Sequence, residues 1–162
     1  MVNEVLERAK SDGVVFVELE FTDIFGVLKS IEIPVEALRS ALEKGVWFDG
    51  SSIEGFARIY ESDMLLKPDL DTFSVLPWSA ENGRAAQIIC DVCTPDEEPF
   101  EGDPRGILRR MMEKAAALGF TYNVGPEIEF FLLERERFPN LVPHDRKGYF
   151  DLGVHSRAVR IC

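Results

Sequence analysis

The sequence predicts an α+β protein that begins with a small sheet domain. Two stretches of alternating apolar residues, 15–22 and 27–33, are joined by Asp23-Ile24-Phe25-Gly26, which is typical of a β-hairpin. A helical pattern follows: Pro34 stands in a first-turn position, and apolar residues recur at helical spacing at Val35, Leu38, Ala41 and Leu42. The order strand, strand, helix is how a β-grasp domain begins.

The elements around this nucleus follow from local patterns. Residues 1–12 predict an N-terminal helical segment, with Ser11-Asp12-Gly13 as its stop, and Gly45 stands where the cap of the next helix is expected. Residues 48–56 predict a loop, because two glycines, two serines and an aspartate lie between aromatic residues. Further strands are expected at 58–66, 72–76 and 85–92, and the β-grasp domain is expected to span residues 13–98.

A second domain is expected to begin after residue 98. Residues 94–99 are acidic and contain two prolines, which predicts a linker. Asp103-Pro104 is a strong helix start, and the predicted helix ends before Gly119. Two strands, 120–124 and 127–133, should follow, and the remaining residues are too few to complete a second domain.

Within the second of these strands, Glu127 and Glu129 are candidate metal ligands. Alternate side chains of a strand share a face, so the two carboxylates would project together. Two acids on one half-buried face repel each other unless a cation or water lies between them, and oxygen ligands suit Mg²⁺ or Mn²⁺. The spacing alone leaves open a plain alternative, and indeed favours it: a strand with a solvated outer face and with Ile128 and Phe130 in the core.

Composition excludes several functional classes. The chain has 162 residues, 46% of them apolar, and a net charge of −11, which argues against a nucleic acid or an anionic membrane as partner. No apolar run is long enough to cross a bilayer and no secretory pattern is present, so a cytoplasmic location is expected. Cys90 and Cys93 match C-x-x-C, but in a strand they face opposite ways, which disfavours a redox or zinc site.

Three segments together resemble bacterial type I glutamine synthetase. They are the stretch 20–26 ahead of Ile33-Pro34, the stretch 48–53 that runs on to 61–64 and 68–69, and Gly125-Pro126-Glu127-Ile128-Glu129-Phe130-Phe131. The resemblance implies a β-grasp domain followed by the first helix and strands of an incomplete catalytic domain over residues 99–162. It implies ATP-dependent ligation of ammonia to glutamate through γ-glutamyl phosphate, with ATP as substrate, Mg²⁺ or Mn²⁺ as cofactor, and a homo-oligomer, in the family a dodecamer.

The resemblance also implies roles for individual residues. Glu127 matches a ligand of the metal that bridges the phosphates, and Glu129 a ligand of the metal nearer glutamate. Asp49 matches a catalytic aspartate that reaches a neighbouring subunit's site and helps to bind and deprotonate ammonium; without the resemblance, an Asp-Gly turn is the preferred reading. Ser52 would support the same loop, and Arg58 aligns with a position tied to feedback inhibition by glutamine, although a surface ion pair fits it equally. The nucleotide-binding residues stay unknown.

The chain also departs from the family. Family enzymes are much longer, and residues 153–162 lose the resemblance and carry no acidic residue, which suggests a shifted reading frame or a truncated gene. The chain alone is therefore expected to be inactive. Two alternatives stay open: a β-grasp module that associates with intact subunits without catalysis, and a related ligase that joins glutamate to another amine.

Overall fold

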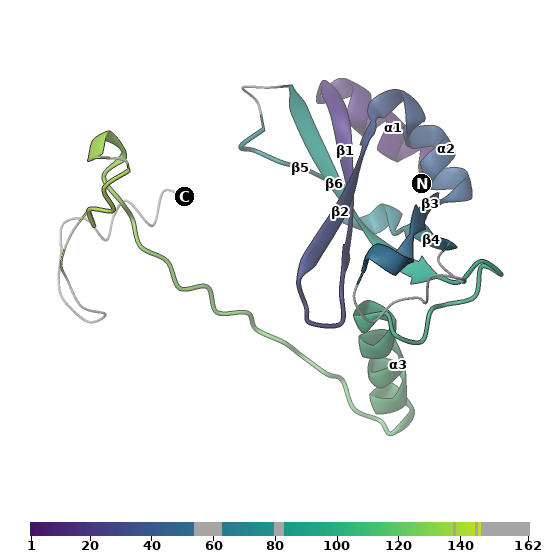
Figure 1. The fold of residues 1–162 in the computed structure, drawn as a ribbon. Helices are drawn as coiled ribbons and strands as arrows, with labels where there is room; N and C mark the ends of the chain where they lie inside the picture. The colour runs from purple at the N-terminus through teal and green to yellow at the C-terminus, as the bar shows by residue number, and fades with distance from the viewer. Residues whose placement is uncertain (54–62, 80–82, 138, 145, 147–162) are drawn as a thin grey trace. The chain divides into compact units, whose positions relative to one another are not determined.

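The computed structural model describes residues 1–53, 63–79, 83–137, 139–144 and 146. It divides into two compact units, Met1–Tyr122 and Asn123–Cys162. The first unit holds a mixed sheet and the helices labelled in Figure 1. No helix within the described ranges is both long enough and apolar enough to span a membrane.

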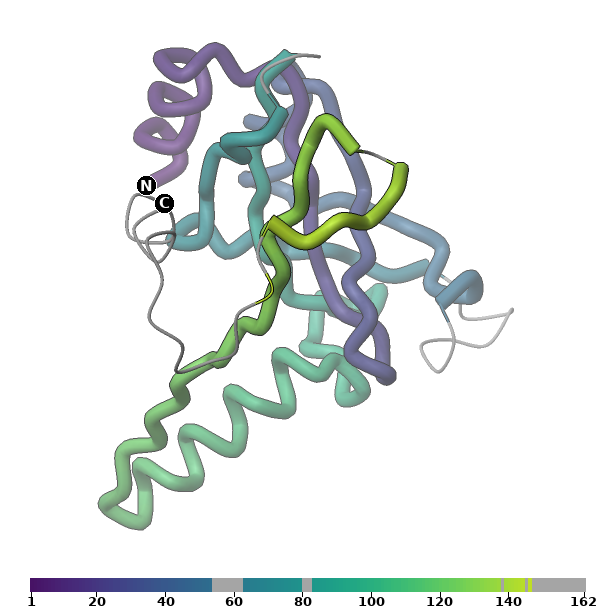
Figure 2. The backbone as a smooth tube through the Cα atoms, turned by 90° about the vertical axis from the view of Figure 1, so that its left-hand side faces the viewer, coloured from purple at the N-terminus to yellow at the C-terminus, as the bar shows by residue number. Residues whose placement is uncertain are grey.

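The sheet of the first unit is built around a predicted hairpin. Strand β1 (Val14–Thr22) pairs antiparallel with β2 (Leu28–Pro34), and the two run side by side to their turn in Figures 1 and 2. The path of the sheet is β2-β1-β6-β4-β3, with β1 parallel to β6 and the short β5 also paired with β6. The other strands are β3 (Val46–Asp49), β4 (Asp63–Pro68), β5 (Ser74–Val75) and β6 (Arg84–Cys93).

Two helices cover one face of this sheet and close the core. They are α1 (Val2–Ser11) and α2 (Leu38–Lys44), the latter preceded by a 3-10 turn at Val35–Ala37. Both were predicted, and the apolar stripe of α2 is buried as expected, because Leu38, Ala41 and Leu42 pack with β1 and β6 side chains in one core. The backbone of Gly45 takes φ +76° at the end of α2, as its capping position required.

Helix α3 (Pro104–Ala117) confirms the helix predicted from Asp103-Pro104. The Asp103 carboxylate caps it by accepting hydrogen bonds from the backbone amides of Arg105 and Gly106, both at 3.1 Å. Gly119 takes φ +83° just beyond the helix. The cap and the proline therefore decide where α3 begins.

Two local predictions were wrong within the first unit. Phe48 and Asp49 belong to strand β3 rather than to a loop, because they pair with Met64 and Asp63 of β4. Of the strand expected at 72–76, only Ser74–Val75 forms a strand, β5, because Asp69 caps a 3-10 turn at Leu70–Thr72. Of the strand expected at 58–66, residues 58–62 lie outside the described residues.

The acidic stretch 94–99 is a hydrogen-bonded turn rather than an open linker. The Thr94 amide donates to the Glu98 carbonyl at 2.8 Å, and the Glu97 amide donates to the Thr94 carbonyl at 2.9 Å. Pro99 then forms an isolated bridge with Cys93 at the end of β6. The turn thereby folds the chain back from β6 toward α3.

The strands predicted at 120–124 and 127–133 are not formed. Residues 120–132 have no regular secondary structure, and Leu133 makes only an isolated bridge to Pro143. The expected core residues are exposed instead, with 81% of Ile128 and 61% of Phe130 accessible. A strand needs a neighbour for its backbone hydrogen bonds, and among the described residues only the segment 142–144 reaches this one, at its end, where the His144 amide donates to the Leu132 carbonyl at 2.8 Å.

Candidate functional site

Asp49 ends the edge strand β3, where its carboxylate is exposed. It accepts hydrogen bonds from the Ser51 hydroxyl at 2.6 Å and from the Ser51 backbone amide at 2.9 Å. These two bonds, the hydroxyl first, lower the pKa of Asp49 below its usual range. Asp49 is therefore a preorganised anion at the end of a strand.

The hydroxyl that fixes Asp49 was not singled out from the sequence. It belongs to Ser51, in the 3-10 turn Gly50–Ser52, whereas Ser52 is exposed at the end of that turn. An aspartate whose side chain bonds the backbone two residues on forms an Asx turn, so the Asp-Gly-Ser order could have pointed to Ser51. Arg58 lies outside the described residues.

A second carboxylate stands directly opposite Asp49. The register of β3 and β4 pairs Asp49 with Asp63, which is also exposed. Like charges at facing positions of an antiparallel pair repel each other. This corner of the sheet is thus suited to a cation.

Glu127 and Glu129 are both exposed, in the part of the second unit that has no regular secondary structure. Their carboxylate oxygens are the donor type that Mg²⁺ and Mn²⁺ prefer, so the residues fit the metal in chemistry. They do not complete a site, since no group of three or more potential ligands occurs among the described residues. Two carboxylates alone hold such ions weakly.

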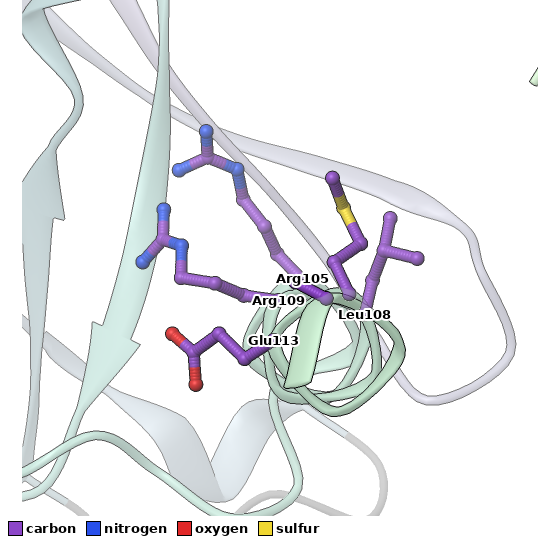
Figure 3. Close-up of a pocket in the computed structure, with 6 residues that line it drawn as sticks. Arg105, Leu108, Arg109 and Glu113 are labelled. Atoms are coloured by element: carbon purple, nitrogen blue, oxygen red, sulfur yellow. The ribbon is translucent and has the colours of Figure 1, made fainter. Parts of the chain in front are cut away.

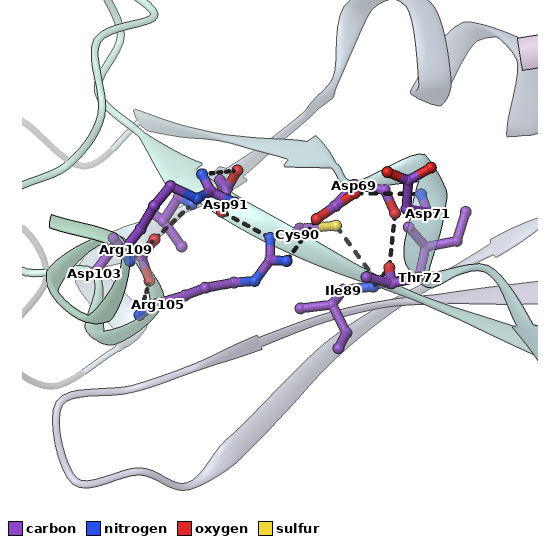
Figure 4. Close-up of polar contacts among 12 residues, drawn as sticks. Asp69, Asp71, Thr72, Ile89, Cys90, Asp91, Asp103, Arg105 and Arg109 are labelled. Atoms are coloured by element: carbon purple, nitrogen blue, oxygen red, sulfur yellow. Dashed lines mark hydrogen bonds and ion pairs between the residues drawn. The ribbon is translucent and has the colours of Figure 1, made fainter. Parts of the chain in front are cut away.

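An ion-pair network anchors α3 to the sheet (Figure 4). The Arg105 guanidinium donates to Asp69 at 2.6 Å and to Asp91 at 2.8 Å, and Arg109 donates to the other Asp91 oxygen at 2.8 Å. The bond from Arg105 is the largest influence on Asp69 and lowers its pKa. Sequence reasoning missed this network because its members are distant along the chain and form no motif.

Two buried groups beside the network have raised pKa values. Burial raises the pKa of Asp103, although the amides of Val92, Arg105 and Gly106 donate to it. Burial also raises the pKa of the Cys90 thiol to about 12, with Asp91 adding to the effect. The Cys90 thiol therefore stays protonated at neutral pH, and a protonated thiol is a poor nucleophile.

Helix α3 presents a partly apolar groove of about 480 Å³, lined by Arg105, Leu108, Arg109, Met112, Glu113 and Ala116. Figure 3 shows Arg105 and Arg109 projecting from one side of the helix and Leu108 from another. Leu108 and Met112 are about half exposed. The helix thus has one side held to the sheet by ion pairs and another that is open in this chain.

Two family models match the chain one after the other. The glutamine synthetase β-grasp domain matches residues 13–95, and the glutamine synthetase catalytic domain matches residues 101–160. The second match includes residues 153–160, so the expectation that the stretch 153–162 loses the family resemblance is wrong for most of its length.

Curated relatives agree with these matches. A glutamine synthetase of Thermotoga maritima is 54% identical over 99% of this chain and 37% of its own length. One of Clostridium saccharobutylicum is 50% identical over 92% of this chain and 34% of its own length. The chain therefore spans about a third of the length of these relatives.

Solved structures share the fold. A structure titled as a complex of GmaS with ADP superposes with a TM-score of 0.64, 25% identity, and coverage of 70% of this chain and 26% of its own. The glutamine synthetase of Plasmodium falciparum superposes with a TM-score of 0.65 at 24% identity, covering 74% of this chain and 23% of its own. With its β-grasp sheet and two consecutive domain matches, the chain belongs to the glutamine synthetase family.

Proposed function

We propose that this chain supplies the β-grasp domain and the beginning of the catalytic domain of an enzyme that ligates ammonia to glutamate. The reaction would use ATP and pass through γ-glutamyl phosphate. The observation that carries the proposal is the consecutive match of both glutamine synthetase domains, at 13–95 and 101–160. The chain by itself would be inactive, because its described residues bring together too few metal ligands for phosphoryl transfer.

Glu127 and Glu129 are the residues of this chain that would hold Mg²⁺ or Mn²⁺. Bound there, the metal would neutralise phosphate oxygens, and phosphoryl transfer depends mainly on such electrostatic stabilisation. Both side chains are exposed in this chain and so remain available to further ligands. The remaining ligands and the nucleotide contacts would come from the rest of the enzyme.

Asp49 would hold the ammonium ion at the site of a neighbouring subunit in a homo-oligomer. Its lowered pKa keeps it anionic at neutral pH, which suits the binding of a cation. The same shift makes Asp49 a weaker base, so we assign it to ammonium binding ahead of proton removal. Ser52 would help to shape the turn that follows Asp49. Arg58 would take part in regulation by glutamine. The assembled enzyme would act in the cytoplasm.

A chimera tests this function. The first third of the T. maritima relative would be replaced by this chain, and glutamine formation would be measured with glutamate, ammonium, ATP and Mg²⁺. We expect an active enzyme in which Asp49→Asn raises the KM for ammonium at least tenfold and leaves the KM for ATP nearly unchanged. Asp96→Asn, at an exposed turn position, is the matched control.

The same chimera separates the enzyme from its main alternative. An assembled, folded chimera that forms no glutamine would contradict the catalytic proposal. It would favour a β-grasp module that joins other subunits without contributing to chemistry.

A further inference from the structure

The face of the sheet opposite α1 and α2 carries an acidic row on β1. Because alternate residues share a face, Glu18, Glu20 and Thr22 point the same way. The register places Ser30 of β2 on one side of Glu20 and Ile89 of β6 on the other. Glu20 thus lies in the middle of this face, between two strands.

A small cavity of about 130 Å³ opens beside Glu20. Its lining includes the Glu20 side chain, Leu28 and Ile89 from the sheet, and Arg105 from α3, together with Thr22 and Cys90. The surface of the cavity is mainly apolar, and the volume suits a group of a few non-hydrogen atoms. One carboxylate in an apolar cavity favours a ligand with a positively charged group and a short alkyl chain.

Glu20 has no partner within the described part of the chain. Only 9% of the residue is exposed, and its carboxylate oxygens, which still reach solvent, form no hydrogen bond or ion pair there. Burial, and then repulsion from Glu18, raises its pKa. A carboxylate that is partly desolvated and accepts no hydrogen bond from the described residues is open to a cationic donor.

Arg105 is not that partner, although it lines the same cavity. Its guanidinium donates to Asp69 at 2.6 Å and to Asp91 at 2.8 Å, and these two carboxylates hold it in place (Figure 4). With Glu18 and Glu20 added, carboxylates outnumber guanidinium groups around the cavity. The local field therefore favours a further cation.

We propose that this cavity binds a cationic nitrogen group, an alkylammonium or an alkylguanidinium. The N–H groups of this cation would donate hydrogen bonds to the Glu20 carboxylate. The short alkyl chain would rest on Leu28 and Ile89. The cation could be a free small amine or a lysine or arginine side chain of a partner protein, since both present the same chemistry. The site lies on β1 and α3, involves neither Asp49 nor the two candidate metal ligands, and does not depend on the proposed catalytic function.

Binding can be measured on the full 162-residue chain by NMR. The amide shifts would be followed during titration with ethylammonium chloride and, separately, with sodium chloride at equal ionic strength. We expect saturable shifts at Glu20, Thr22 and Ile89 with ethylammonium alone. Tetramethylammonium, which has no N–H donor and a bulkier head, should not produce them.

Glu20→Gln should weaken ethylammonium binding at least tenfold. The variant should fold, because it removes a partly desolvated charge while keeping the shape of the side chain. Glu32→Gln is the matched control: Glu32 pairs with Glu18 on the same face but is exposed, and it does not line the cavity. The Glu32→Gln variant should bind ethylammonium as tightly as the unmodified chain does.

A second ligand distinguishes the two sources of the cation. Tighter binding of Nα-acetyl-lysine methylamide than of ethylammonium would assign the cavity to a side chain of a partner protein. Tighter binding of ethylammonium would assign it to a free amine. Shifts equal to those in sodium chloride, or unchanged binding in Glu20→Gln, would overturn the proposal while leaving the catalytic function untouched.

Discussion

Replacing Asp103 with alanine should loosen α3 selectively. Only 3% of the Asp103 residue is exposed, and its carboxylate accepts hydrogen bonds from the amides of Arg105 and Gly106 at 3.1 Å and of Val92 at 3.4 Å. Loss of a helix cap costs about 1 kcal/mol. Leaving the buried Val92 amide without an acceptor adds roughly 1 kcal/mol, at the low end of the usual range because that bond is long.

The expected total is therefore about 2 kcal/mol, or roughly a thirtyfold increase in the opening of α3. Hydrogen exchange of the α3 amides and of Val92 measures this opening directly. Asp103→Asn is the control: it keeps an acceptor oxygen and removes a desolvated charge, so it should cost less than about 1 kcal/mol. Equal exchange in the alanine and asparagine variants would refute the capping argument.

Three further predictions concern the first unit. Gly45→Ala should lower the free energy of unfolding in urea by about 2 kcal/mol, because φ is +76° and the new Cβ would lie 2.6 Å from a β4 carbonyl oxygen. Gly119→Ala is the control: φ is +83°, but nothing lies within 4 Å of the new Cβ, so the loss of stability should be smaller. The pKa of Asp69, measured by NMR titration, should lie below the ordinary value of 3.8 and should rise in Arg105→Gln. Because the pKa is lowered in the folded state, the ionised Asp69 stabilises the fold above pH 3.8, and this stabilisation is lost as the pH falls through the folded-state pKa. An unchanged pKa of Asp69 in the variant would contradict this prediction. Cys90 should resist iodoacetamide at pH 8 and react in urea, since its pKa of about 12 leaves almost no thiolate; rapid labelling of the folded chain would count against that.

Much of the first unit could be predicted from local sequence alone. The hairpin, α1, α2 and α3 each carry their own signals: alternation, helical spacing, and the Asp103-Pro104 start. Strand β3 could not be recognised, because its residues Val46–Asp49 become a strand only through pairing with β4. The strand expected at 127–133 did not form for the converse reason: its pattern is correct, but among the described residues it is paired only at its end, by the bridge from Leu133 to Pro143.

The candidate site divides in the same way. Asp49, Glu127 and Glu129 could be proposed from the sequence because each stands in a continuous motif. Arg105 and Glu20 could not be found, because their importance comes from residues of distant strands and from burial in the folded sheet. Their contacts required the three-dimensional structure.

Metal binding by the chimera tests the central claim most directly. Mn²⁺ would be titrated into the chimera and its free concentration followed by electron paramagnetic resonance. Glu127→Gln and Glu129→Gln should each weaken one class of bound Mn²⁺ at least tenfold, which is about 1.4 kcal/mol, while Glu136→Gln, an exposed control nearby, should change nothing. Mn²⁺ binding that is unaffected by both substitutions would contradict the claim that this chain supplies metal ligands to a glutamine synthetase.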